Sequence, residues 1–283
     1  YIGTATRFDT RNSPRSVLAL VRACFRHRTS AKSAPMSKLY KSKTCAYCGK
    51  LGVSQTGDHV VARALVAEAL RGEIPIVPAC LACNGKKAEL EHYAATVIPF
   101  GGRHEGASVS LERDLPRRLA KNQRLRRELA SGQLRVWSEE SGLLVPSLTI
   151  PIDGERLEEL VGYIVKGLMF HHWGVALASD CSVEAYSLTQ RGEQTFDRHL
   201  AMNAAQRVSG DIGQGAFTYR GLQAVDNANI SMWEVSLFGG FKTFGYDELN
   251  SSTKYGVMTG PVAVIQRAER IAASGLLVPT RPL

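Results

Sequence analysis

The chain has 283 residues, of which 44% are hydrophobic and 7% aromatic, so it can bury a sizeable core in one large or two ordinary domains. This composition excludes a globally disordered chain. No apolar run approaches the roughly 18 residues that a membrane-spanning helix needs, so we expect no membrane partner. The formal net charge is +9, and a localised basic field is typical of proteins that meet phosphates.

The positive charge is concentrated toward the N-terminus. Residues 1–43 hold ten Lys or Arg against one acid, a net charge of +9. Residues 44–130 hold 13 against 9, a net +4, and residues 131–283 hold 12 against 16, a net −4. This distribution indicates a nucleic-acid partner near the N-terminal half, and a solvated basic tail is the alternative interpretation.

The first 35 residues differ from the rest because they are rich in Arg and Ser and contain a single acid, Asp9. Residues 1–43 are therefore expected to form a basic N-terminal arm, of which 1–35 are either disordered or not native. Three interpretations fit: an arm for nucleic acid, a transit peptide, or translated upstream sequence. We favour the third, because Met36 leads directly into the cysteine-rich part of the chain.

Four of the six cysteines form two Cys-x-x-Cys pairs, Cys45/Cys48 and Cys80/Cys83, separated by 31 residues. Four thiolates close a tetrahedral Zn²⁺ site and leave no open position, so this spacing predicts a structural zinc. One pair alone would also suit a redox dithiol, but two pairs without a thioredoxin-like context favour metal. The other two cysteines are isolated, which fits a reducing, cytoplasmic compartment.

Polar residues of another kind lie between and just after these pairs: Asp58, His59, Asn84, Lys86 and Lys87. A neutral imidazole can take a proton from water, and on a strand the adjacent carboxylate points to the opposite side. Carboxylate and amide oxygens suit Mg²⁺ or Mn²⁺ rather than the thiolate-bound zinc. The two lysines, at the start of an expected helix, are candidates to attract phosphate. Taken singly, each of these residues is an ordinary surface group, and it is their joint spacing that indicates a site.

These motifs resemble the HNH endonucleases of the ββα-metal class in their zinc-stapled, four-cysteine form. The resemblance covers residues 44 to about 95 and is carried by Cys45-x-x-Cys48, Asp58-His59-Val60 and Cys80-x-x-Cys83-Asn84-x-x-Lys87. It implies a hairpin that carries Asp58 and His59, packed on a short helix that begins around Cys83.

The same resemblance implies hydrolysis of DNA phosphodiester bonds, with His59 as general base and with Asp58 and Asn84 as ligands of a catalytic Mg²⁺ or Mn²⁺ ion. Many members of the family place an Asn where this chain has Pro75, so we expect another group, such as a backbone carbonyl, to orient His59. A non-catalytic zinc module that binds nucleic acid is the alternative. RNA also stays open as the substrate, because no aromatic stacking motif selects either polymer.

The nuclease module is expected to span residues 44–100 and to end at Gly101-Gly102. A basic helical linker, 101–130, follows it, with one mostly exposed helix from Leu111 to Ala130. This helix either lies along a phosphate backbone or is a solvated connection.

Residues 131–283 are expected to form a separate domain, which makes the whole chain α+β. Asp153 is a candidate N-cap for a helix whose apolar residues recur at helical spacing: Leu157, Leu160, Val161, Ile164 and Leu168. The alternation at Trp233, Val235 and Leu237 predicts a strand, from which Gly239-Gly240 would turn into a second one at Phe241–Tyr246. Val262–Ile265 is a further predicted strand. This domain would select DNA structure, contact a protein partner, or act as a sensor in bacterial defence or a mobile element.

Overall fold

The fold is described from a computed structural model, in which residues 37–140, 143–202, 206–240, 251–271 and 277–278 are described. The predicted N-terminal arm as far as residue 36, and the predicted strand at Phe241–Tyr246, lie outside these residues. Residues Met36–Leu283 form one compact unit, and the account below concerns this unit alone.

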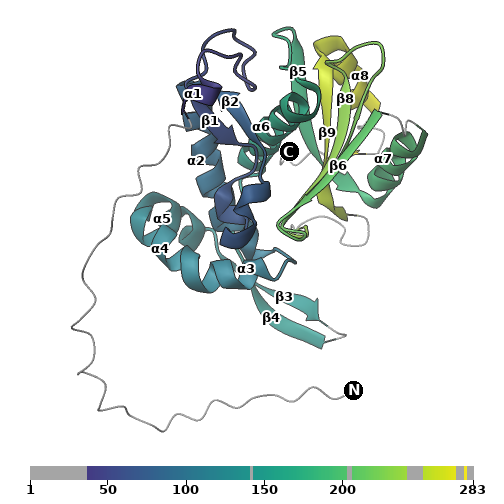
Figure 1. Ribbon diagram of the computed structural model, residues 1–283. Helices are drawn as coiled ribbons and strands as arrows, with labels where there is room; N and C mark the ends of the chain where they lie inside the picture. Colours follow the sequence, from purple (N-terminus) through teal and green to yellow (C-terminus); the bar gives the residue numbers. More distant parts are fainter. Residues whose placement is uncertain (1–36, 141–142, 203–205, 241–250, 272–276, 279–283) are drawn as a thin grey trace, which may run out of the picture. The chain divides into compact units, whose positions relative to one another are not determined.

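The first part of this unit is a two-stranded antiparallel sheet followed by a helix (Figure 1). Thr56 pairs with Ala79 and His59 with Ile76, which confirms the predicted hairpin. The following helix begins at Leu81 and continues for 17 residues, so it is longer than the short helix expected. The elements are α1 (Ser37–Tyr40), β1 (Thr56–His59), β2 (Ile76–Ala79) and α2 (Leu81–Val97).

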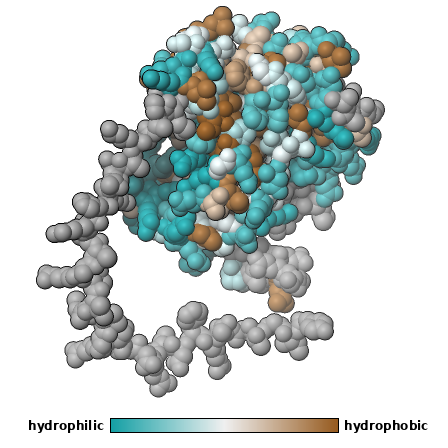
Figure 2. Space-filling view, in the orientation of Figure 1, coloured by the Kyte–Doolittle hydropathy of each residue, from teal (hydrophilic) through white to brown (hydrophobic). Residues whose placement is uncertain are grey.

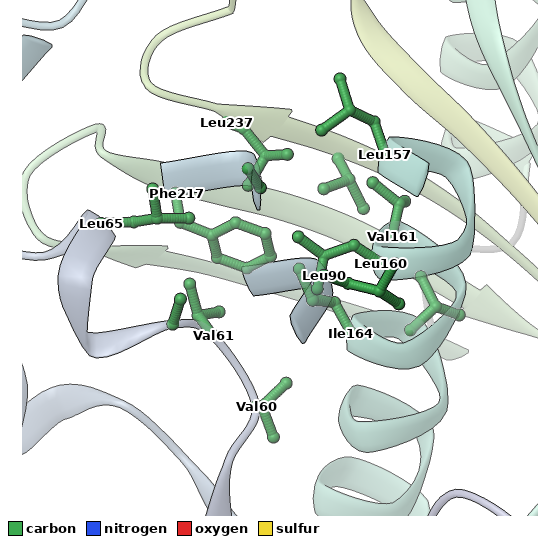
Figure 3. Packing of buried hydrophobic residues seen from close by; sticks show 14 of the residues in the cluster. Val60, Val61, Leu65, Leu90, Leu157, Leu160, Val161, Ile164, Phe217 and Leu237 are labelled. Carbon is green, nitrogen blue, oxygen red and sulfur yellow. The ribbon is translucent and has the colours of Figure 1, made fainter. Parts of the chain in front are cut away.

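The connection between β1 and β2 contains two 3₁₀ helices, η1 (Arg63–Leu65) and η2 (Glu68–Glu73). It is anchored by Val60, Val61 and Leu65, whose side chains are buried. Figure 3 shows these three residues in the same cluster as Leu90 of α2. The segment that directly follows His59 is therefore held by the core rather than extended into solvent.

The basic stretch after α2 is helical but is not the single helix that its sequence predicts. It is interrupted at Asn122, whose φ of −118° and ψ of 78° are not helical. The Asn122 side chain instead accepts a hydrogen bond from the Leu125 backbone N–H at 3.0 Å and so caps a second helix. The elements here are η3 (Ile98–Phe100), α3 (Gly106–Val109), the π-helical turn η4 (Ser110–Asp114), α4 (Leu115–Lys121), α5 (Gln123–Ser131) and the hairpin β3 (Leu134–Glu140) with β4 (Leu143–Thr149).

The rest of the unit consists of a long helix, α6 (Gly154–Trp173), and a six-stranded antiparallel sheet among the described residues. Asp153 caps α6 as predicted, because its side chain accepts a hydrogen bond from the Arg156 N–H at 3.2 Å. The sheet has the order β10-β5-β9-β8-β7-β6. Its elements are β5 (Cys181–Thr189), α7 (Gln190–Met202), β6 (Arg207–Ile212), β7 (Phe217–Gln223), β8 (Ser231–Leu237), β9 (Ser251–Pro261), α8 (Val262–Ile271) and β10 (Leu277–Val278).

The two faces of the sheet are covered by different helices. Side chains alternate along each strand, so neighbouring residues of β8 contact different helices. Trp233 packs toward α6, with its ring centroid 4.9 Å from that of Trp173. Its neighbour Glu234 faces α7, since Arg220 bridges Glu234 and Asp197. The predicted strand containing Trp233 is thus confirmed. The predicted strand at Val262–Ile265 is wrong, because these residues begin the amphipathic helix α8, in which Ile265 is buried and Val262 and Val264 are exposed.

One hydrophobic cluster joins the ββα part to the C-terminal part. Leu90 of α2 lies among Leu160 and Ile164 of α6 and Phe217 of β7 (Figure 3). The C-terminal region therefore shares a core with the ββα part, although its sequence suggested a separate domain. Figure 2 shows mainly hydrophilic residues over the visible surface, with hydrophobic ones in small groups. In the described part of the chain, no helix combines the length and the apolar character that crossing a bilayer requires.

Candidate metal centre and active site

The four cysteines of the two Cys-x-x-Cys pairs meet at one point. The Sγ atoms of Cys45, Cys48, Cys80 and Cys83 all lie within 4.8 Å of one another. Zn–S bonds of about 2.3 Å in a tetrahedron place the sulfurs about 3.8 Å apart, so the cluster needs only a small contraction to hold zinc. The donor set is all thiol, which is the chemistry of a closed structural site. The predicted cluster of four cysteines that could hold a metal ion is therefore present.

Backbone groups support this cluster on both sides. The Cys80 N–H donates to the Sγ of Cys45 at 3.4 Å, and the Cys83 N–H donates to the Sγ of Cys80 at 3.5 Å. After the first pair the chain turns tightly at Gly49, whose φ is +70° and whose N–H donates to the Cys45 carbonyl at 2.9 Å. This left-handed conformation favours glycine. Such N–H groups stabilise negative sulfur, the form that binds a metal.

The thiols of this cluster differ in their pKa. Burial raises the pKa of Cys45 and of Cys83. Burial acts in the same sense on Cys80, but hydrogen bonds from the Cys83 N–H and from neighbouring thiols bring its pKa below the usual value. Four negative sulfurs at this distance repel one another, so a divalent cation is required to hold all of them as thiolates.

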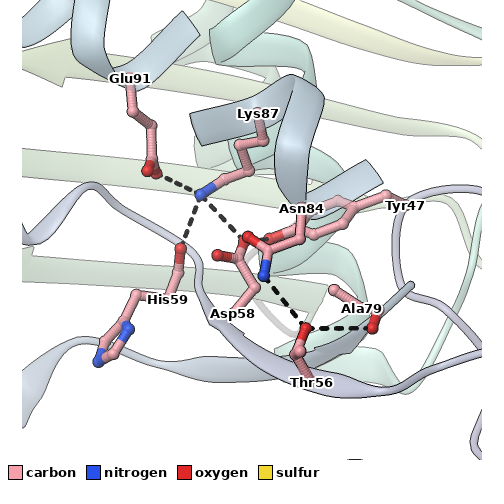
Figure 4. Close-up of polar contacts among 8 residues, drawn as sticks. All are labelled: Tyr47, Thr56, Asp58, His59, Ala79, Asn84, Lys87 and Glu91. Atoms are coloured by element: carbon pink, nitrogen blue, oxygen red, sulfur yellow. Dashed lines mark hydrogen bonds and ion pairs between the residues drawn. The ribbon is translucent and has the colours of Figure 1, made fainter. Parts of the chain in front are cut away.

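Asp58 and His59 lie on opposite sides of β1, as strand geometry predicts. Asp58 is 8% exposed and points into the protein, whereas His59 is half-buried. Figure 4 shows the His59 imidazole directed away from the side chains of Asp58, Asn84 and Lys87. His59 is also the last residue of β1, so the alternation of side chains ends at this point.

Lys87 joins the groups beneath this strand. Its ammonium nitrogen lies 2.7 Å from the backbone carbonyl oxygen of His59 and 3.1 Å from the Oδ2 of Asp58. It also forms an ion pair with Glu91, one helical turn further along α2. Tyr47 donates its hydroxyl to the Oδ2 of Asp58. A fully buried ammonium is thus balanced by two carboxylates and a carbonyl (Figure 4).

The burial of Lys87 corrects one expectation. The sequence suggested that Lys86 and Lys87 both attract phosphate, but the Lys87 side chain is fully buried and cannot reach a ligand in solvent. Lys86 is the exposed lysine of the pair, and its ammonium lies 3.3 Å from the carboxylate of Glu159 in α6. Lys87 is therefore a structural part of the site.

Asn84 brings a neutral oxygen to the same side of the strand as Asp58. Its Nδ2 donates to the Thr56 hydroxyl at 3.1 Å, and that hydroxyl donates to the Ala79 carbonyl at 3.3 Å. This chain of hydrogen bonds fixes the amide group, so its oxygen is directed away from Thr56. Thr56 and Asp58 are two residues apart on β1 and share one side of the strand, so Asn84, bonded to Thr56, lies on that side too (Figure 4). An amide oxygen and a carboxylate oxygen are the hard donors that Mg²⁺ or Mn²⁺ prefers.

The pKa of His59 is lowered, first by burial and then by the positive charge of Arg63, while Asp58 opposes this effect. The imidazole is therefore neutral at pH 7, which is the form that accepts a proton. In the described part of the chain no group hydrogen-bonds this imidazole. The orienting group expected in place of the usual Asn is therefore not found among the described residues; at Pro75 itself, the backbone carbonyl accepts a hydrogen bond from the Val60 N–H at 2.8 Å.

A cleft of about 300 Å³ lies between α6 and β5, near the cysteine cluster. Most of its ionisable lining is acidic: Glu155, Glu158, Glu159 and Glu184, with Tyr163 and Lys166. Like charges repel, so this cleft is unsuited to a phosphate backbone.

The sequence singled out Asp58, His59 and Asn84 but missed Tyr47, Thr56 and Glu91. Glu91 had a local signal, because a carboxylate four residues after Lys87 lies on the same helical face. Tyr47 and Thr56 had none, since their contacts join segments that only the fold brings together. No family model, no curated protein and no solved structure matches this chain.

Proposed function

We propose that the protein is a metal-dependent endonuclease of the HNH type, acting on DNA phosphodiester bonds. The observation that supports this most is the joint placement of Asp58 and Asn84 beside β1 in a ββα unit that four cysteines tie together. The proposal also assigns the protein to the cytoplasm, because a reducing compartment keeps four thiols available for zinc.

In this proposal Asp58 and Asn84 would hold a Mg²⁺ or Mn²⁺ ion through their carboxylate and amide oxygens. Carboxylate and amide oxygens are the donor types that suit such an ion. Lys87 pairs with the Oδ2 of Asp58, so the Oδ1 of Asp58 is the oxygen left for it. When bound, the ion supplies stabilisation of the charge that develops on the phosphate and on the leaving oxygen.

His59 takes the proton from the attacking water in this mechanism. Its imidazole is neutral at pH 7 because its pKa is lowered. Since His59 ends β1, a phosphate at the end of this strand would be approached by the imidazole from one side and by the cation that Asp58 would hold from the other. Lys87 holds the His59 carbonyl and so fixes the backbone from which the imidazole projects.

Cleavage of supercoiled plasmid DNA in Mg²⁺ or Mn²⁺ tests this proposal. His59→Ala should lower the rate of nicking by about 10²–10⁴-fold, the usual contribution of a general base. His92→Ala is a matched control, because His92 is exposed on α2 of the same unit. Equal cleavage by the His59 variant and the parent, with zinc content unchanged, would overturn the assignment. Cleavage of RNA but not DNA would correct the substrate.

A non-catalytic zinc module that binds nucleic acid is the second candidate. It is favoured by the absence, among the described residues, of any hydrogen bond to the His59 imidazole. Binding of DNA that weakens with salt, without cleavage in a series of divalent metals, would support this candidate over the nuclease.

A further inference from the structure

Seven basic side chains lie between Arg113, at the end of η4, and Arg127; the other six belong to the helices α4 and α5. Arg118 is turned inward, where it donates to the backbone carbonyl of Ala95 in α2 and lies 3.3 Å from the hydroxyl oxygen of Ser110. The other six are exposed and are called the basic face: Arg113, Arg117, Lys121, Arg124, Arg126 and Arg127.

Helical geometry explains why these cations are exposed. With 3.6 residues per turn, Leu115, Arg118 and Leu119 share the side of α4 that faces the protein. Arg113, Arg117 and Lys121 recur every four residues on the opposite side, in a row. In α5, Leu125 and Leu129 are buried, so the arginines of that helix point outward. Apart from Arg118, both helices therefore turn their cations to solvent.

Most of this charge is not neutralised by the part of the chain that the structure describes. Arg113 pairs with Asp114 at 2.9 Å. The other five side chains of the basic face form no ion pair with any residue that the structure describes. Like charges four residues apart destabilise a helix, so the row weakens α4 unless an external anion offsets it. Residues four apart rise about 6 Å along a helix, close to two nucleotide steps of about 3.4 Å on one DNA strand.

The basic face is attached to the candidate active site. Arg118 ties α4 to α2, the helix that provides Asn84 and Lys87. At its other end, the pKa of Arg113 is raised by Asp114 and, more weakly, by the negative charge of Glu68 in η2. η2 belongs to the connection that leaves His59. The cleft beside α6 is lined mainly by glutamates, so it does not offer positive charge to a phosphate backbone.

We propose that the basic face of α4–α5 binds the phosphate backbone of duplex DNA and holds it in register with the site at the end of β1. This inference rests on the proposed nuclease function and adds the surface that positions its substrate. The contacts are to phosphates only, so the face provides affinity without reading the base sequence.

The salt dependence of DNA binding by the full chain tests the inference. The parent, here carrying His59→Ala to prevent cleavage, is compared with a triple variant that adds Arg117→Gln, Lys121→Gln and Arg124→Gln. Glutamine keeps helix propensity, so α4 and α5 should stay folded. The control replaces three exposed arginines far from these helices in the sequence: Arg191, Arg198 and Arg207. Affinity for a fluorescent duplex is measured by anisotropy at several salt concentrations.

Each phosphate contact contributes about 0.9 to the slope of log affinity against log salt. The triple variant should therefore lose about 2–3 from that slope, while the control keeps the parental value. An unchanged slope, or an equal loss in the control, overturns the inference. A loss confined to duplex RNA or to an acidic peptide overturns the choice of DNA. If the protein with His59 intact never cuts DNA but the slope difference is found, the nuclease proposal fails and the binding surface stands.

Discussion

The ammonium nitrogen of Lys87 lies 2.7 Å from the backbone carbonyl oxygen of His59. A buried cation on α2 thus holds the backbone of the residue proposed as general base, on the side of β1 opposite to its imidazole. The same ammonium balances Asp58 and Glu91. The position of the proposed general base therefore depends on a fully buried residue.

Replacing Lys87 should be severely destabilising. In Lys87→Met the carboxylates of Asp58 and Glu91 are left buried without their cation, which costs about 3–5 kcal/mol of the free energy of unfolding. Glu91→Gln should cost much less, because burial already raises the pKa of Glu91 and Asp58 still balances the lysine. Urea denaturation of both variants measures the difference, and an equal loss in both would contradict this account of the network.

The metal cluster should control folding of the whole unit. Cys80→Ser removes one of four thiolates, so bound zinc should fall from about one equivalent to well below it, and stability should fall by more than about 4 kcal/mol. Cys181→Ser is the matched control, since that thiol lies outside the cluster. Elemental analysis and thermal unfolding check both points. Zinc content that survives in the Cys80 variant would contradict the four-cysteine site.

Contact between α6 and the end of β1 can be tested at a glycine. A Cβ at Gly167 would lie 3.0 Å from the Cγ2 of Val60, so Gly167→Leu should destabilise by about 1–3 kcal/mol through overpacking. A Cβ at Gly85 meets no heavy atom within 4 Å, so Gly85→Ala should gain about 0.5–1 kcal/mol. Chemical denaturation of the two variants gives the comparison. A neutral effect at Gly167 would show that the two parts do not pack closely.

Stability should fall on mild acidification. Burial, and then His171, lower the pKa of His172 below its ordinary value of 6.5. The unfolded chain therefore binds the proton more readily, so the free energy of unfolding decreases as the pH falls from 6.5 through the lowered pKa. His172→Gln should make the unfolding midpoint less sensitive to pH in this range. In this variant part of the pH dependence of the unfolding midpoint should remain, because the pKa of His59 is also lowered.

The exposed His92 provides the control for that measurement, and His92→Gln should retain the parental pH dependence of the midpoint. A His172 variant with an unchanged slope would mean that the hydrogen bond to the Tyr219 hydroxyl at 2.9 Å offsets the effect of burial on the imidazole.

Local patterns in the sequence predicted the elements that depend on local chemistry. Asp153 begins α6 because a carboxylate satisfies the first N–H groups of a helix, wherever the helix packs. The alternation around Trp233 predicted β8, because that strand has an apolar face against α6. The spacing of the cysteines predicted their cluster, since two Cys-x-x-Cys pairs suit one metal.

The errors arise where tertiary contacts decide the outcome. Val262–Ile265 is a short apolar run, and periodicity alone does not separate a strand from the first turn of a helix in so few residues. Lys87 looks like a surface lysine until the fold places Asp58 and the His59 carbonyl beside it. Asn122 ends α4 because its side chain accepts a hydrogen bond from the first turn of the next helix. The run of basic residues on both sides of Asn122 gave no sign of this break.

The shared core has a consequence for how this protein is divided. A fragment ending near residue 130 would contain every cysteine ligand and every proposed catalytic group, yet it would leave the α6-facing side of α2 in water. Leu90 and Tyr93 would be exposed there. The Tyr93 hydroxyl would also lose the hydrogen bond that the Asp153 N–H donates to it at 2.6 Å. Such a fragment should aggregate. For expression or fusion, the smallest independent piece is therefore set by the packing of α6 rather than by the motif.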